Sequence, residues 1–146
     1  MNQFEKIKER IKIEIIKILD SKQYIISSTI VGSFMDCIEL REISDIDIVI
    51  IVDKLNESTF NEIINSFERI KCSEIGLDGY DIIINTTFGP LKFNSKKTIV
   101  FHVMIYDIKG HIKHVEDSPF TCYSWEKNEP IYGISLKEVY PVIWNR

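Results

Sequence analysis

The stretch that decides the fold is STIVGSFMDCIELREISDIDIVIIV, residues 28–52. It contains two runs of Ile, Val and Thr, which are typical of buried strands. Gly32 and Ser33 follow the first run, and Asp45 and Asp47 open the second. Side chains two residues apart on a strand point to the same face, about 6.6 Å apart. The sequence therefore predicts two carboxylates on one side of an otherwise apolar strand.

The segments around this stretch predict an α+β domain with a mixed sheet that is flanked by helices mainly on one face. Thr59 and Glu62 form a capping-box pattern, as do Ser135 and Glu138. The predicted elements are a helix at 2–20, a strand at 24–31, a short helix or turn at 34–43, a strand at 45–52, a helix from 59 to about 70, a hairpin of strands at 79–88 and 98–108 joined by 89–97, and a short helix at 134–140. We expect one domain over residues 1–146, with an N-terminal helix (2–20), a core (24–108) and an aromatic-rich C-terminal segment (109–146).

The composition is that of an ordinary globular domain. The 146 residues are 45% hydrophobic and 27% charged, and a chain of this length buries roughly 70% of its unfolded surface. The net charge of −4 makes a long nucleic acid an unlikely partner, because such proteins carry a basic face. A small anionic substrate held by a metal ion is compatible with this charge.

The cysteine pattern indicates a reducing compartment. Cys37, Cys72 and Cys122 lie far apart and form no CxxC pair, so we expect free thiols and a cytoplasmic location. The N-terminal segment MNQFEKIKERIKIE is too charged for a signal peptide, and no apolar run approaches the length of a membrane span. We therefore expect no membrane contact.

Asp45 and Asp47 have the chemistry of a divalent-cation site. Two close carboxylates repel each other unless a cation lies between them, and Mg²⁺ accepts one or two carboxylates together with substrate phosphates. A pair of such ions about 3.5–4 Å apart can hold both oxygens of a phosphoryl displacement. Gly32 lets a phosphate approach the backbone, and Ser33 offers an N–H and a hydroxyl. An Asp-x-Asp is also common in turns and helix caps. The prediction therefore depends on the combination of the Gly-Ser pair with the Asp-x-Asp pair.

This combination resembles the nucleotidyltransferase superfamily of DNA polymerase beta type. The matching residues are Val31-Gly32-Ser33 and Ser44-Asp45-Ile46-Asp47-Ile48, with eleven residues between Ser33 and Asp45. The chain looks most like the small single-domain members. The resemblance implies that Asp45 and Asp47 bind two Mg²⁺ ions and that Gly32 and Ser33 hold the phosphates of a nucleoside triphosphate. Small members usually carry a basic residue soon after Gly-Ser; here Arg41 is the nearest cation and is the candidate for that role.

The family completes its metal site with an acidic residue on a later strand. Asp81, which opens an apolar run, is our candidate, and a turn residue after Gly79 is the alternative. His102, at an equivalent depth on the next predicted strand, is the competing candidate for the third position. An imidazole is a poor Mg²⁺ ligand, so His102 could instead be a general base on the acceptor hydroxyl or a core histidine.

Three other features have a functional and an ordinary interpretation. His111 and His114 could bind zinc on a helix, although a solvated turn is the simpler interpretation. The aromatic C-terminal segment, 118–146, could contact a base or a protein partner, or close the sheet. The basic residues on the predicted hairpin turn, which could contact an anionic acceptor or be plain surface, are Lys92, Lys96 and Lys97.

Two functions follow from this sequence. The first is an enzyme that transfers a nucleoside monophosphate from a nucleoside triphosphate to a hydroxyl of a small molecule or a protein and releases pyrophosphate. The second is a non-catalytic module that senses nucleotides or binds a partner, such as the antitoxin of a toxin–antitoxin pair. Two features favour the second function: no basic residue stands directly after Ser33, and the third metal position can fall on Asp81 or on His102. The intact Gly-Ser and Asp-x-Asp pairs favour the first function.

Overall fold

The computed structural model describes residues 3–32, 34, 43–85 and 98–144. The strands in them are β1 (Ile25–Val31), β2 (Ile43–Val52), β3 (Asp81–Ile84), β4 (Thr98–Asp107) and β5 (Tyr132–Gly133). The helices are α1 (Gln3–Asp20), α2 (Glu57–Glu68), α4 (Ile108–Asp117), α5 (Pro119–Glu126) and α6 (Leu136–Val139), with a 3₁₀ turn, η2 (Cys72–Ile75).

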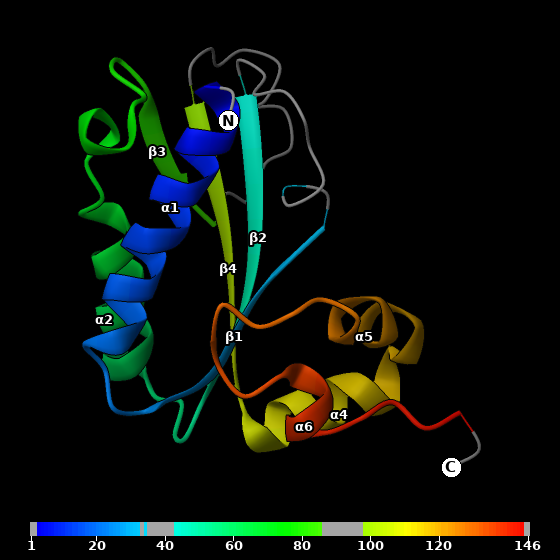
Figure 1. Ribbon diagram of the computed structural model, residues 1–146. Helices are drawn as coiled ribbons and strands as arrows, with labels where there is room; N and C mark the ends of the chain where they lie inside the picture. The colour runs from blue at the N-terminus through cyan, green and yellow to red at the C-terminus, as the bar shows by residue number, and fades with distance from the viewer. Residues whose placement is uncertain (1–2, 33, 35–42, 86–97, 145–146) are drawn as a thin grey trace.

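The five strands form one sheet in the order β3-β4-β2-β1-β5 (Figure 1). β1 runs antiparallel to β2 and to β5, whereas β2 and β3 both run parallel to β4. The predicted α+β class with a mixed sheet is therefore confirmed. The expectation that the Ile- and Val-rich run at 45–52 is a buried strand is also confirmed, because β2 has a partner on each side and the side chains from Ile48 to Val52 are fully buried.

The predicted hairpin of residues 79–88 and 98–108 is wrong. Asp81 pairs with Thr98 and Ile84 with Phe101, so β3 and β4 run in the same direction. A hairpin joins antiparallel neighbours, whereas parallel neighbours need a crossover of a dozen or more residues. Thirteen residues separate Ile84 from Thr98, which is long enough for a crossover; residues 86–97 lie outside the described part of the chain.

The two capping-box predictions have opposite outcomes. Asn56, not Thr59, caps α2: its side-chain oxygen accepts a hydrogen bond from the Thr59 amide at 2.8 Å, which places Thr59 in the first turn. The helix therefore begins two residues before Thr59, at Glu57. At α6 the box is complete, because Ser135 accepts from the Glu138 amide and Glu138 accepts from the Ser135 amide.

The alternation of side chains along β2 divides the core into two parts. Ile46, Ile48, Ile50 and Val52 face the layer formed by α1 and α2, where Phe67 packs against Phe101. On the opposite face a smaller cluster is centred on the following buried residues: Val31, Val49, Ile51 and Leu136.

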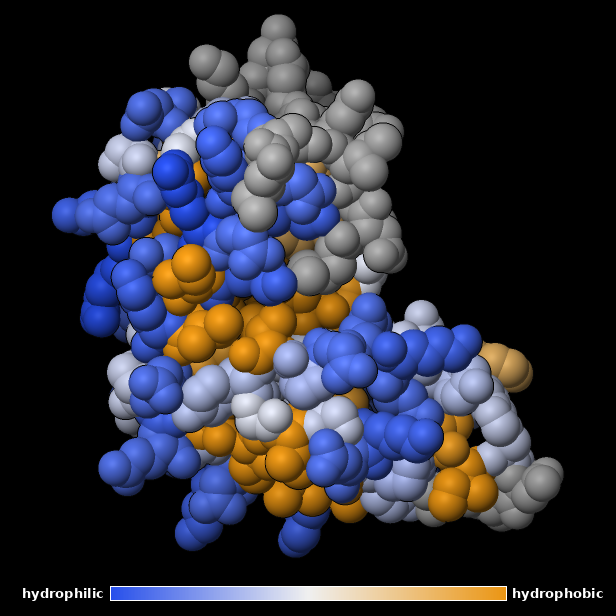
Figure 2. Space-filling view, in the orientation of Figure 1, coloured by the Kyte–Doolittle hydropathy of each residue, from blue (hydrophilic) through white to orange (hydrophobic). Residues whose placement is uncertain are grey.

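This second cluster is covered by α4, α5 and α6. We call residues 108–144, which include these three helices and the residues that follow α6, the C-terminal lobe. Trp125 and Val139 of the lobe pack against it. Figures 1 and 2 show the lobe projecting from one end of the sheet. The expectation of helices mainly on one face misses this layer. α5 has a weak apolar pattern, and α4, although amphipathic, buries only His111 and Val115. The lobe covers the half of this face that lies away from Asp45.

Candidate functional site

β2 places Asp45 and Asp47 on the same face of the sheet as Val49 and Ile51, and toward the end that the C-terminal lobe leaves uncovered. Both aspartates are half-buried, and one carboxylate oxygen of Asp45 is shielded from solvent. Strand alternation forces this arrangement, since residues two apart share a face. The prediction that the two carboxylates lie on one side of the strand is confirmed.

Gly32 lies directly against Asp47. Val31, the last residue of β1, pairs with Asp47 on β2, and Gly32 continues the chain with a φ of +79°. A Cβ atom built on Gly32 would lie 3.0 Å from Oδ2 of Asp47. Because glycine has no Cβ and accepts a positive φ at little cost, the backbone can approach the carboxylate here. Gly32 itself is exposed.

β4 brings the titratable residue His102 beside the two aspartates, Asp45 and Asp47. Parallel pairing sets His102 opposite Asp47 and Val100 opposite Asp45, and neighbouring strands are about 4.8 Å apart. Burial raises the pKa of the Asp47 carboxyl, and the nearby His102 partly offsets that rise. The Asp47 carboxylate is thus desolvated, and a divalent cation would compensate for the lost hydration.

Asp81 does not lie beside the two aspartates. It is exposed at the start of edge strand β3, where it pairs with Thr98, two residues before the partner of Asp45 on β4. Two strand spacings and one two-residue step separate the Cα atoms of Asp81 and Asp45 by about 12 Å. Within the described ranges, no group of three or more His, Cys, Asp or Glu side chains could hold a metal ion. The role of Asp81 stays a prediction.

Two predicted nucleotide-binding residues, Ser33 and Arg41, lie outside the described residues, as does the basic tip formed by Lys92, Lys96 and Lys97. Lys8, which the fold brings to Phe34, is not among the residues that the sequence pattern predicts for the site. The signal for Lys8 was weak: a lysine beside the apolar stripe of an amphipathic helix is usually a solvated flank.

The desolvated Asp47 leads to a stability prediction. Its pKa is raised in the folded state, so the folded protein is more stable below the unfolded pKa and loses stability as the pH rises through the folded pKa. Without metal, Asp47→Asn should therefore increase the melting temperature at pH 7. At pH 3 both states of the wild type carry a protonated carboxyl and the gain should vanish. Thermal unfolding at the two pH values checks this; an equal or lower melting temperature at pH 7 would contradict it.

His111 and His114 lie on α4, so the expectation of a solvated turn is wrong. His111 is 1% exposed. The ring of His114 stacks on Tyr106, with centroids 5.2 Å apart, and meets the edge of Trp125 at 4.9 Å. Its Nδ1 lies 3.5 Å from the buried Cys122 sulfur. These contacts fix α4 and α5 on the sheet, so the histidines have a packing role.

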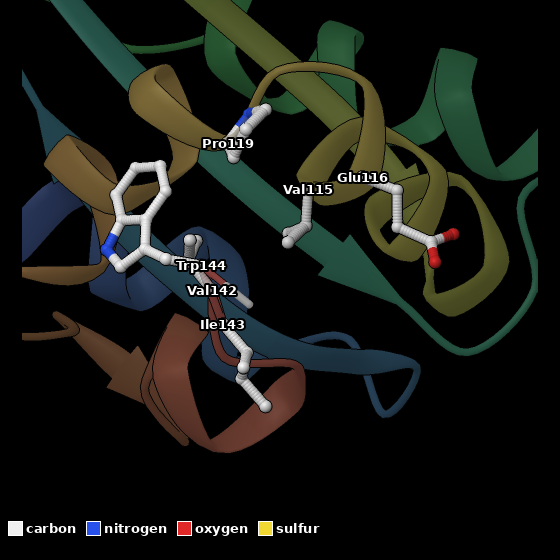
Figure 3. Close-up of a pocket in the computed structure, with 6 residues that line it drawn as sticks. All are labelled: Val115, Glu116, Pro119, Val142, Ile143 and Trp144. Carbon is white, nitrogen blue, oxygen red and sulfur yellow. The ribbon is translucent and has the colours of Figure 1, made fainter. Parts of the chain in front are cut away.

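The aromatic C-terminal segment is partly exposed. Phe120 is 81% and Trp144 49% exposed, and their rings lie 5.0 Å apart. Beside Trp144 is a pocket of about 220 Å³ whose lining residues are Val115, Glu116, Pro119, Val142, Ile143 and Trp144 (Figure 3). The pocket lies between the end of α4 and the segment that follows α6. A role in partner binding stays a prediction.

Two of the three cysteines, Cys72 and Cys122, are free thiols, and Cys37 is outside the described residues. Within the described part of the chain, no helix is both long and apolar enough to cross a membrane.

Comparisons with protein-family models, with curated proteins and with solved structures find no match to this chain.

Proposed function

We propose that this protein is a metal-dependent nucleotidyltransferase, which transfers a nucleoside monophosphate from a nucleoside triphosphate to an acceptor hydroxyl and releases pyrophosphate. The observation that carries the proposal is the contact between Gly32 and Asp47. It sets an exposed backbone turn, suited to phosphate oxygens, beside two carboxylates that share one face of β2. A metal–triphosphate needs both halves of such a site.

The donor set fits Mg²⁺. The two carboxylates are hard oxygen ligands, and the desolvation that raises the pKa of Asp47 is relieved by a bound cation. Asp45 and Asp47 would hold the metal, which when bound neutralises phosphate charge that develops during transfer. Gly32, together with Ser33 and Arg41 from the sequence pattern, would hold the phosphates. The mixed sheet with α1 and α2 on one face is compatible with a nucleotidyltransferase-like fold.

The acceptor would approach from the side of β4. His102 stands opposite Asp47 on the same face, where its imidazole could orient or deprotonate the attacking hydroxyl. Asp81 would contact the acceptor only from edge strand β3, where it lies. The net charge of −4 favours a small molecule or a protein as the acceptor over a long nucleic acid.

A second function, a non-catalytic nucleotide sensor or partner-binding module, is favoured by one observation. The register sets His102, and no carboxylate, beside Asp47, while Asp81 lies two strands from β2. Such a site would bind a metal–triphosphate without completing the transfer. The exposed aromatic cluster of the C-terminal lobe is then the candidate surface for a partner.

Titration of the purified protein with Mg²⁺ and each nucleoside triphosphate tests the proposal. We expect metal-dependent binding by calorimetry, its loss in Asp45→Asn/Asp47→Asn, and its retention in Asp53→Asn, a matched exposed carboxylate that follows the same strand. Pyrophosphate release with a set of hydroxyl acceptors then separates the two functions. Wild-type protein that binds no nucleotide, or binds it equally without a divalent cation, would overturn the nucleotidyltransferase proposal.

A further inference from the structure

Lys8 of α1 is a buried cation that contacts two aromatic rings. Lys8 is only 6% exposed. The Nζ atom lies 5.2 Å from the ring centroid of Phe4 and 5.8 Å from that of Phe34. The two rings meet edge to face, at 6.4 Å and 88°. The three side chains therefore form one contact group, which joins α1 to the residue two positions after Gly32.

The position of Lys8 is not required by the packing of α1. The apolar stripe formed by Ile7, Ile11 and Ile15 already buries the helix against the sheet. A lysine usually extends its ammonium into water, and burial costs it much of its side-chain freedom. Attraction between an ammonium and aromatic faces offsets that cost when the rings lie within about 6 Å. Both rings meet this criterion.

Phe34 connects this contact group to the candidate site. It is 4% exposed and belongs to the core on the α1 side of the sheet. Gly32, two residues earlier, lies against Asp47 on the opposite face. Phe34 is thus anchored on α1, and Gly32 is anchored on β2.

We propose that Lys8 is a positioning residue of the nucleotide site. By holding Phe34 on α1, it restrains the chain that follows β1 and keeps Gly32 in contact with Asp47. The inference rests on the proposed function, since it assigns Lys8 to the phosphate-binding half of that site. A backbone fixed before binding does not have to be ordered by the ligand, so the nucleotide binds more tightly.

The test compares Lys8→Met, which keeps an unbranched stem and removes the charge, with Lys8→Arg, which keeps a cation that stacks on aromatic rings. Lys12→Met is the matched control, because Lys12 lies one turn further along α1 and pairs with Glu9 at 3.5 Å. We expect Lys8→Met to weaken the affinity for the Mg²⁺–nucleoside triphosphate about three- to tenfold, the range typical of a cation–aromatic contact. Lys8→Arg and Lys12→Met should stay near wild type.

Two further readouts separate positioning from general destabilisation and from failure of the proposed function. The amide NMR shifts of Gly32 and Phe34 should move in Lys8→Met and stay in Lys12→Met, with or without nucleotide. Mn²⁺ affinity in the absence of nucleotide should be unchanged in all variants. If these amide shifts stay constant in Lys8→Met, or if Mn²⁺ and nucleotide affinity fall together, the role of Lys8 is overturned. If the wild type binds no nucleotide while the shifts move, the proposed function fails and the structural role of Lys8 stands.

Discussion

Gly32→Ala should lower the rate of the proposed nucleotidyl transfer about tenfold, less than the hundredfold that a displacement of about 1 Å costs. The new Cβ would lie 3.0 Å from Oδ2 of Asp47, closer than a relaxed contact. The carboxylate is the movable partner, because it is the end of a side chain. The Asp47 carboxylate would therefore shift by a few tenths of an ångström, and metal-dependent nucleotide binding should weaken with the rate.

Gly79→Ala is the matched control for this substitution. Gly79 has a φ of +82°, close to the +79° of Gly32, but a Cβ there would meet nothing within 4 Å. Each alanine should cost about 1–2 kcal/mol of stability, because L-residues are strained in the left-handed region. Urea unfolding should show similar losses in the two variants, whereas only Gly32→Ala should impair nucleotide binding. Equal nucleotide affinity in both variants would show that the contact with Asp47 is irrelevant to the site.

His111 should make the fold sensitive to acid. Burial, with a smaller contribution from His114, lowers the pKa of His111 to about 4, compared with about 6.5 in an unfolded chain. Neither ring nitrogen has a hydrogen-bond partner among the described residues. A lowered folded-state pKa means that the stabilisation is complete above pH 6.5 and is lost as the pH falls toward 4. The loss should be about 3 kcal/mol over that interval.

His111→Phe, which keeps an aromatic ring and removes the titration, should abolish most of this slope. His114→Phe is the control. Burial also lowers the pKa of His114, but the His114 ring is only half-buried, so the change in slope should be smaller. Denaturant unfolding between pH 4 and pH 7 measures both. An unchanged slope in His111→Phe would show that acid destabilises the protein through other groups.

The main strands and long helices could be predicted from the sequence because their apolar periodicity is strong. α1 places an apolar residue toward the sheet every three or four positions, and β2 is a continuous run of Ile and Val after Asp47. The orientation of β3 could not be predicted in this way. Two neighbouring apolar strands have the same local pattern whether they pair parallel or antiparallel, and only long-range contacts separate the two cases.

The C-terminal lobe shows a second limit of sequence patterns. α4 buries His111 and Val115, and α5 buries Cys122. α5 has a weak periodic signal, whereas α4 is amphipathic but buries a histidine, which counts as polar in such a pattern. Only the packing of Tyr106, His114 and Trp125 shows why these helices form.

The sequence by itself determined which two carboxylates share a face, because the alternation of a strand is a local property of the backbone. Tertiary structure alone decided which residues meet them. The antiparallel pairing of β1 set Gly32 against Asp47, and the parallel pairing of β4 set His102, rather than Asp81, at its side. Pairing joins residues far apart in the chain, and its register depends on how whole strands bury their apolar faces.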